Sequence, residues 1–191
     1  QGSGISPILF AIMVNDLPDV IRSDKALFAD DCAMWECGLN IPSLLVKVQD
    51  SLNAVQSWCN QWGFKLSKDK SVAMLFTRKR KTCRLLLELD GTALSFVDSW
   101  KYLGLIFDKS LNYKNHIDYV SKKCIRRSNL IRLLAGSAWG ANKSTLLTLY
   151  RTLIRSIVDY GAQAYFFAPK NSLSRLQVIQ NQALRLCCGA M

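Results

Sequence analysis

Histidine is almost absent from this chain, which contains a single one, His116, among its 191 residues. Its seven cysteines are scattered, and no pair shows the Cys-x-x-Cys spacing of zinc sites and thiol redox motifs. A zinc site is therefore not expected. An odd number of thiols in a chain of this size does not indicate a disulfide framework either, so we expect reduced, mostly buried thiols in an intracellular protein.

Long apolar runs are also missing. No run approaches the roughly 18 apolar residues that span a bilayer. The nearest candidate, residues 146–167, contains Arg151, Arg155 and Asp159, so we expect no membrane-spanning segment. The chain begins with Gln1 rather than Met, which suggests a fragment of a longer protein, and any targeting segment would then lie outside this sequence.

Acidic residues become scarce after residue 110. Residues 1–110 contain 13 Lys and Arg against 12 Asp and Glu, whereas residues 111–191 contain 12 Lys and Arg against Asp118 and Asp159 alone. The net charge of +11 therefore lies almost entirely in the second part. Solvated helix faces normally mix both signs of charge, so this asymmetry favours a polyanionic partner, most often a nucleic acid.

Half of the residues are hydrophobic and a fifth are charged, which is typical of a folded globular protein. The apolar pattern mixes helical and strand-like segments at first and becomes helical from about residue 112. In the first part it predicts a buried helix over residues 6–16 with Ser6 as N-cap, a helix over 42–62, strands over 71–77 and 102–107, a basic loop over 78–84 and a hairpin over 85–96. In the second part it predicts helices that begin near residues 112, 143 and 172, the last capped by Ser172.

Two adjacent acids, Asp30 and Asp31, interrupt the otherwise apolar run from Ala26 to Trp35. Apolar residues on both sides of a polar break predict a β-hairpin with the acids at or beside its turn. Two ionised carboxylates held together repel each other unless a cation lies between them, and a divalent metal supplies that cation. The alternative is that Asp occurs here simply as a common turn residue.

Several segments follow the order and spacing of the motifs of one known family. Gln1-Gly2 with Ser6-Pro7 resembles the Gln-Gly/Ser-Pro segment of reverse transcriptases, and Phe28-Ala29-Asp30-Asp31 resembles their metal-binding box. Residues 62–71 are similar to the lysine-bearing segment that follows, and residues 101–108 to the hairpin that supports the primer end. Residues 111–117, 149–161 and 176–185 resemble the region after the polymerase core in jockey-like non-LTR retrotransposons.

This resemblance implies an α+β fold in two parts. Residues 1–108 would form a partial polymerase palm, an antiparallel sheet with packed helices, and residues 109–191 a basic, all-helical thumb-like region. The implied activity is that of an RNA-directed DNA polymerase, with an RNA template, a DNA primer and deoxynucleoside triphosphates as partners. The parent element would act in the cytoplasm and nucleus. The oligomeric state is not readable from the sequence.

The resemblance also assigns roles to residues of the first part. Asp30 and Asp31 would be catalytic and would hold Mg²⁺ in a two-metal site, with Asp30 as the main ligand. Lys70 would be catalytic as a charge or proton donor near the departing pyrophosphate, although by spacing alone an exposed lysine after a turn is the commoner explanation. The nucleotide-binding residues would be Gln1, Gly2 and Phe28.

The remaining roles concern the nucleic acid. Tyr102, Leu103 and Gly104 would position the primer, with plain strand packing as the alternative. The phosphates of the template–primer duplex would be contacted by Lys122, Arg126, Arg151 and Arg155. If about six cations make such contacts, the logarithm of affinity should fall with the logarithm of salt concentration with a slope near −5.

The family's site needs a further carboxylate on a strand that precedes the Gln-Gly segment, and this chain starts after that point. Asp16 and Asp19 do not match the missing position. We therefore expect an incomplete metal site and little or no polymerase activity from the isolated polypeptide. A nucleic-acid-binding remnant without catalysis and a non-functional relic stay open as alternatives, although the presence of both acids favours the enzyme.

Overall fold

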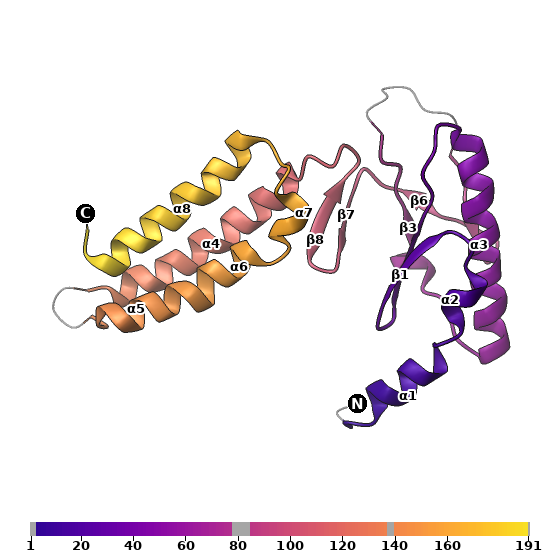
Figure 1. The fold of residues 1–191 in the computed structure, drawn as a ribbon, viewed down its shortest axis with the longest axis horizontal. Helices are drawn as coiled ribbons and strands as arrows, with labels where there is room; N and C mark the ends of the chain where they lie inside the picture. Colours follow the sequence, from indigo (N-terminus) through magenta and orange to yellow (C-terminus); the bar gives the residue numbers. More distant parts are fainter. Residues whose placement is uncertain (1–2, 78–84, 137–139, 191) are drawn as a thin grey trace. The chain divides into compact units, whose positions relative to one another are not determined.

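Helices and short strand pairs alternate along residues 3–77, 85–136 and 140–190, which are the residues that the computed structural model describes (Figure 1). The fold class is therefore α+β, as the sequence predicted. The basic loop expected over residues 78–84 lies outside the described residues. None of the described helices is both long and apolar enough to cross a bilayer.

The chain divides into two units, residues 1–75 with 79–97, and residues 76–78 with 98–191. The second unit therefore contains residues 98–108, which the sequence assigned to the palm. The division into palm and thumb after residue 108 concerns roles in a polymerase rather than compactness, and it stays a prediction.

Helix α3 (Ile41–Trp62) of the first unit runs almost where the sequence placed it. The Asn40 side chain accepts a hydrogen bond from the Ser43 N–H, and Gly63 ends the helix in the left-handed conformation. Its buried face packs on α2 (Leu17–Val20). The core of this unit is formed by Leu17, Ile21, Val55, Trp58 and Cys59.

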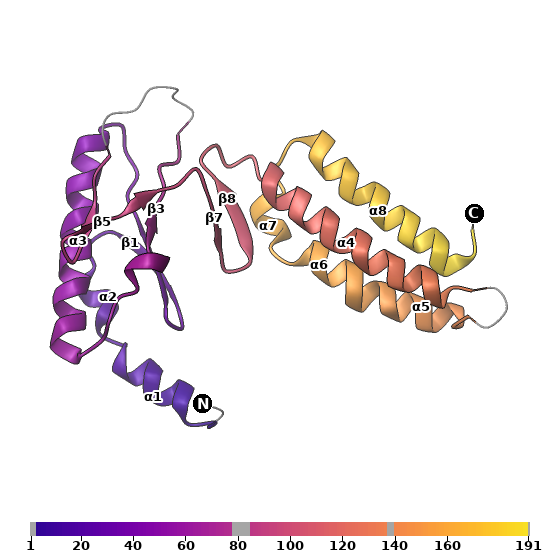
Figure 2. The same ribbon diagram turned by 180° about the vertical axis from the view of Figure 1, so that it is seen from behind.

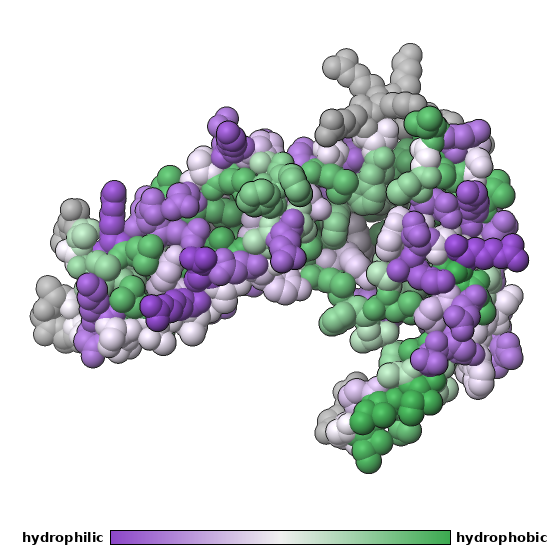
Figure 3. All heavy atoms as spheres, viewed as in Figure 1, coloured by the Kyte–Doolittle hydropathy of each residue, from purple (hydrophilic) through white to green (hydrophobic). Residues whose placement is uncertain are grey.

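Helix α1 (Ser6–Met13) differs from the prediction in two ways. Its N-cap is Ile5, without a side-chain cap bond, so the prediction of a Ser6 cap is wrong. The prediction of a buried helix is also wrong, because none of its residues is buried and Ile8 and Ile12 are more than 60% exposed. Figure 3 shows the apolar surface along this helix. The apolar pattern predicted burial, but no described element covers the outer face of α1.

The strands of the first unit form two-stranded pairs. Strand β1 (Asp24–Phe28) pairs antiparallel with β2 (Asp31–Trp35), and β4 (Glu88–Leu89) pairs with β5 (Thr92–Ala93) around the expected turn. Strand β3 (Val72–Ala73) runs parallel to β6 (Ser95–Phe96). Strand β3 covers only two of the residues predicted as a strand over 71–77, because β6, the strand with which it pairs, is itself only two residues long. Among the described residues, the antiparallel sheet expected of a palm is thus present only as pairs.

Glutamine side chains of α3 hold the β4–β5 hairpin in place. Gln49 accepts from the Glu88 N–H and donates to the Glu88 carbonyl, both at 2.9 Å. Gln56 accepts from the Asp90 N–H at 2.9 Å and donates to the Asp90 carboxylate at 3.1 Å. An amide side chain carries both a donor and an acceptor, so Gln49 makes with Glu88 the pair of main-chain bonds that a neighbouring strand would make. Gln56 bonds one main-chain group and the side chain of Asp90.

The second unit consists of a hairpin and a layer of helices (Figure 2). Strands β7 (Ser99–Tyr102) and β8 (Leu105–Asp108) pair antiparallel where the apolar pattern predicted one strand. Helix α4 (Lys114–Leu134) packs against α5 (Lys143–Tyr150) and α8 (Lys170–Cys188). The apolar residues that recur at helical spacing along α4, Ile117, Val120, Cys124 and Ile131, form a buried stripe in the core.

The helix predicted from Lys143 continues to Asp159 but changes its pitch on the way. A π-helical segment, Arg151–Arg155, joins α5 to α6 (Ser156–Asp159), and α7 (Ala162–Tyr165) follows. A π-helical turn accommodates an extra residue, and Ile154, within this segment, is fully buried. Helix α8 has Pro169 as its N-cap, so the prediction of a Ser172 cap is wrong.

Asp108 organises the link between β8 and α4. Its buried carboxylate accepts hydrogen bonds from the N–H groups of Ser110, Asn112 and Tyr113 and from the Ser110 hydroxyl. Leu111 and Tyr113 have φ values of 54° and 55°, which large side chains rarely adopt. Burial by itself raises the pKa of Asp108, but the four hydrogen bonds outweigh it and hold the pKa below its ordinary value. One ionised carboxylate therefore offsets the strain of this link.

Two glycines let the β7–β8 hairpin pack closely on the helices. The Tyr160 hydroxyl donates a hydrogen bond to the Leu103 carbonyl at 2.8 Å. Gly104 has a φ of +81°, and a Cβ at this position would lie 2.9 Å from the Tyr160 ring. A Cβ at Gly161 would lie 2.5 Å from the Leu105 side chain. Gly104 is therefore favoured by its backbone conformation and by the nearby ring, and Gly161, with a φ of +68°, chiefly by its backbone conformation.

We predict that Asp108→Ala destabilises the second unit by about 3 kcal/mol, because three N–H groups lose a buried acceptor. Urea unfolding followed by circular dichroism measures this loss. Since the pKa of Asp108 is lower in the folded chain, its contribution should be complete above about pH 4 and should disappear as the pH falls through the folded-state pKa. An alanine variant with the same acid sensitivity as the unaltered protein would contradict this role.

We predict that Gly104→Ala destabilises the same unit by about 2–4 kcal/mol, since it combines an unfavourable φ with a clash against Tyr160. Gly189→Ala is the matched control, because Gly189 also has a positive φ (+65°) but nothing within 4 Å of its Cβ position. The control should lose only about 1 kcal/mol. Equal losses in the two variants, measured by urea unfolding, would show that the contact with Tyr160 contributes nothing.

Candidate functional site

The β1–β2 hairpin carries the acid pair at one end. Phe28 and Asp31 are the last facing residues of the two strands, and Ala29 and Asp30 form the turn between them. Ala29 has a φ of 52°, a left-handed value that favours glycine. A positive φ at the first central residue is a feature of type II′ hairpin turns. This strained turn places Asp30 at the tip and Asp31 at the first position of β2.

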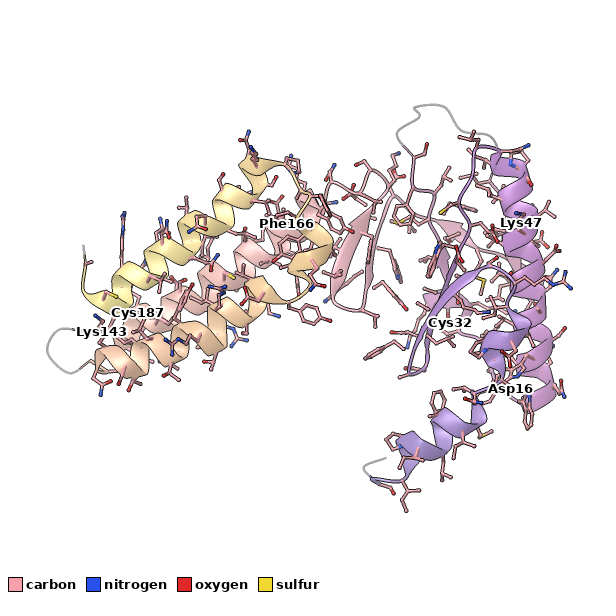
Figure 4. All side chains as sticks on the ribbon, viewed as in Figure 1. Asp16, Cys32, Lys47, Lys143, Phe166 and Cys187 are labelled. Atoms are coloured by element: carbon pink, nitrogen blue, oxygen red, sulfur yellow. The ribbon has the colours of Figure 1, made fainter. Side chains whose placement is uncertain are left out.

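Both carboxylates are exposed, and neither forms an ion pair or a side-chain hydrogen bond with another described residue. Cys32 follows on β2 (Figure 4), but no group of three or more metal-ligating side chains occurs among the described residues. Asp16 is used elsewhere, because it accepts a hydrogen bond from the Trp58 indole at 3.1 Å. The acid pair can therefore supply part of a metal site.

The other residues assigned to nucleotide chemistry lie on separate segments. Phe28 is 63% exposed on the same hairpin as the acids. Lys70 is exposed at the end of the 3₁₀ helix η1 (Lys68–Lys70) of the same unit, whereas Lys68 pairs with Asp90 at 2.6 Å. Gln1 and Gly2 lie outside the described residues. The structure thus brings Phe28 together with the acid pair and places Lys70 on another element.

The residues assigned to the primer form the tip of the β7–β8 hairpin in the second unit. Tyr102 ends β7, and Leu103 and Gly104 are the turn residues, both with positive φ (44° and 81°). The bond from Tyr160 to the Leu103 carbonyl fixes this tip on the helical layer. Leu103 and Gly104 therefore form a turn fixed on the helical layer, and Tyr102 is the last strand residue before it.

Exposed cations follow helix α4 and the π-helical segment. Lys122, Arg126 and Arg151 are exposed and form no ion pair with a described acid. Arg155 differs, because its guanidinium binds the Asp159 carboxylate one turn later at 2.7 Å. Three of the four residues assigned to phosphate contacts thus keep an uncompensated charge in the structure.

A cluster around His116 was missed by the sequence reasoning. His116 is buried, and its Nδ1 accepts a hydrogen bond from the Ile106 N–H at 3.3 Å. The ammonium groups of Lys101 and Lys123 lie 4.9 and 5.9 Å from the centroid of the Tyr119 ring. The spacing of His116, Tyr119 and Lys123 along α4 could have placed these three on one helix face. The approach of Lys101 from the hairpin left no signal in the sequence.

Comparison with known proteins shows what the chain is similar to. The family described as "Reverse transcriptase (RNA-dependent DNA polymerase)" matches residues 1–107. The protein named "Probable RNA-directed DNA polymerase from transposon BS" of Drosophila melanogaster is 28% identical over 200 residues, which cover 97% of this chain and 21% of that protein. "RNA-directed DNA polymerase from mobile element jockey" of the same organism is 26% identical, with 100% of this chain and 22% of that protein covered.

A third relative, "Retrovirus-related Pol polyprotein from type-1 retrotransposable element R1" of Bradysia coprophila, is 24% identical over 97% of this chain and 19% of that protein. The chain thus spans about a fifth of the length of these curated relatives. No solved structure matches it. Because the family match covers more than half of the residues, this chain belongs to the reverse transcriptase family.

Proposed function

We propose that this chain is part of the RNA-directed DNA polymerase of a jockey-like non-LTR retrotransposon. Its β1–β2 hairpin would belong to the palm and carry part of the metal site, and its basic helices would form the thumb. One observation carries the proposal: Asp30 and Asp31 are held exposed and without a protein cation at a strained turn. The names of the relatives support the same enzyme class.

The acid pair fits the ligands that Mg²⁺ prefers, which are carboxylate oxygens. The described residues offer two such groups at this place and no third, so a further carboxylate would have to come from elsewhere in the polymerase. When bound, a pair of Mg²⁺ ions would activate the primer 3′-hydroxyl and neutralise the triphosphate. Asp30 at the tip would be the main ligand, and Asp31 at the strand start its neighbour.

The remaining roles are those that the family resemblance implies. Phe28, with Gln1 and Gly2, would line the nucleotide site, and Lys70 would supply positive charge toward the departing pyrophosphate. The tip formed by Tyr102, Leu103 and Gly104 would position the primer. Lys122, Arg126 and Arg151 would hold the phosphates of the RNA–DNA duplex, because their charges are exposed and lack acidic partners among the described residues. Such contacts position the duplex without reading its sequence.

The second candidate is a nucleic-acid-binding module without catalysis. Two observations favour it: the described residues hold no complete metal-ligand group, and the unpaired cations lie on the helices of the second unit. The two candidates differ in one respect, because only the enzyme needs the acids of the hairpin.

Primer extension on an RNA template separates these candidates. We predict no Mg²⁺-dependent incorporation by the 191-residue chain alone. In a polypeptide extended to the length of its relatives, we predict incorporation that Asp30→Asn lowers at least about 100-fold, as loss of transition-state charge stabilisation does elsewhere. Asp24→Asn is the matched control, since Asp24 is an exposed acid of the same hairpin but lies at its other end. If Asp30→Asn left incorporation unchanged, the acid pair would have no catalytic role.

Binding of an RNA–DNA duplex at increasing salt tests the thumb assignment. Removal of one phosphate-contacting cation should make the slope of log affinity against log salt shallower by about 0.9. We predict this change for Lys122→Gln, Arg126→Gln and Arg151→Gln. Arg155→Gln should change the slope least, because Asp159 already balances its charge. Fluorescence anisotropy measures these slopes, and the same slope in all four variants and the parent would contradict the assignment.

A further inference from the structure

A cavity of about 290 Å³ opens in the second unit between the β7–β8 hairpin, α4 and α6. Its walls include Val120 and Ile157, and its polar lining is formed by Lys101, His116, Tyr119, Lys123, Ser156 and Tyr160. Two of these side chains are cationic and none is acidic. A water molecule occupies about 30 Å³ in the liquid, so the cavity has room for a polyatomic ligand.

The protonation state of His116 follows from its backbone partner. The Ile106 N–H can only donate, so Nδ1, which lies 3.3 Å away, must be the unprotonated nitrogen. The neutral ring then carries its proton on Nε2. Burial lowers the pKa of His116, and the nearby Lys101 charge lowers it further, which keeps the ring in this neutral form. The imidazole therefore offers one N–H donor at Nε2.

That donor has no protein acceptor. Nε2 is buried and without a hydrogen-bond partner among the described residues, and His116 itself is only 2% exposed. A buried donor left unpaired costs free energy, of the order of 1–3 kcal/mol. No neighbouring hydroxyl of the described residues accepts a hydrogen bond from Nε2. The Tyr160 hydroxyl donates to the Leu103 carbonyl, the Ser156 hydroxyl donates to the Thr152 carbonyl, and the Tyr119 hydroxyl accepts from Lys101. A hydrogen-bond acceptor for Nε2–H would therefore have to come from a bound ligand.

The lysines indicate which kind of acceptor fits. Lys101 and Lys123 bring two ammonium groups to one tyrosine ring, at 4.9 and 5.9 Å from its centroid, without an ion pair to any described acid. Both lysines line the cavity and no described acid does, and an anion bound there would offset their positive charge. A phosphate group carries negative charge and several acceptor oxygens, so it satisfies both ammonium groups and the imidazole donor.

We propose that this cavity binds a phosphate group, held by the ammonium groups of Lys101 and Lys123 and by the Nε2–H of His116. The phosphate is either a free ion or one residue of a nucleic-acid backbone, which share this chemistry. The site lies entirely within the second unit. Phosphate binding at this site can be measured without nucleotide incorporation, so its test is independent of the polymerase assignment.

The single histidine of the chain makes the experiment selective. The imidazole signals of His116 are followed by NMR during titration of the 191-residue protein with inorganic phosphate, against sodium chloride at matched ionic strength. Phosphate should shift these signals saturably and raise the pKa of His116, since a bound anion stabilises the imidazolium. Lys101→Gln and Lys123→Gln should each weaken binding about tenfold, the effect of losing one charge-assisted contact.

Lys114→Gln is the matched control, because Lys114 is an exposed lysine of the same helix that does not line the cavity. It should leave the phosphate affinity unchanged. A short RNA–DNA duplex is the second ligand. A response of His116 to the duplex at lower concentration than to phosphate identifies the backbone as the natural source, and a response to phosphate alone identifies a free ion. No response beyond that of chloride, or equal responses in the Lys101→Gln and Lys114→Gln variants, would overturn the site.

Discussion

Separation of charge along the chain is the physical constraint on which both units depend. At one place, Asp30 and Asp31 repel each other with no protein cation to balance them. After residue 110 the only acids are Asp118 and Asp159, both bound to arginines, so most of the described cations of these helices form no ion pair. Under the proposed function, ions from outside would complete each region, a small cation at the hairpin and phosphates at the helices.

Packing within the second unit ties two separate sequence motifs into one body. The turn Leu103-Gly104 and the pair Tyr160-Gly161 are distant in sequence, and 57 positions separate the hydrogen-bonded residues Tyr160 and Leu103. They are joined by that bond and by close contacts at both glycines, Gly104 with the Tyr160 ring and Gly161 with the Leu105 side chain. Asp108 fixes the chain between the hairpin and α4. The tip proposed to position the primer is thus fixed to the same helical layer as the cations proposed to bind phosphates.

Local patterns predicted much of this fold because their causes are local. The turn at Ala29-Asp30, the Asp90-Gly91 turn, the ends of α3 and the buried stripe of α4 all depend on residues close in sequence. Predictions failed where burial, strand length or helical pitch depends on residues that are distant in sequence. The burial of α1 depends on what covers it, the length of β3 depends on β6, and Ile154 enters the core through a change of helical pitch.

The candidate site divides in the same way. The acid pair was predicted because adjacent acids in an apolar run are unusual and local, and the structure shows them exposed at the turn. The balance of Arg155 by Asp159 follows from their spacing of four residues, yet the charge count alone did not reveal it. The cavity at His116 needed tertiary structure, because Lys101 reaches it from the hairpin and Lys123 from α4. Long-range contacts of this kind leave no periodic signal.

Paramagnetic relaxation by Mn²⁺ tests the central claim most directly, since Mn²⁺ shares the oxygen ligands of Mg²⁺ and broadens nearby NMR signals even when it binds weakly. In the 191-residue protein, traces of Mn²⁺ should selectively broaden the amide signals of residues 28–32, and Asp30→Asn should remove that broadening while Asp24→Asn keeps it. Broadening that is spread over all exposed acids, or that persists in Asp30→Asn, would show that the two neighbouring carboxylates do not form a metal-binding site.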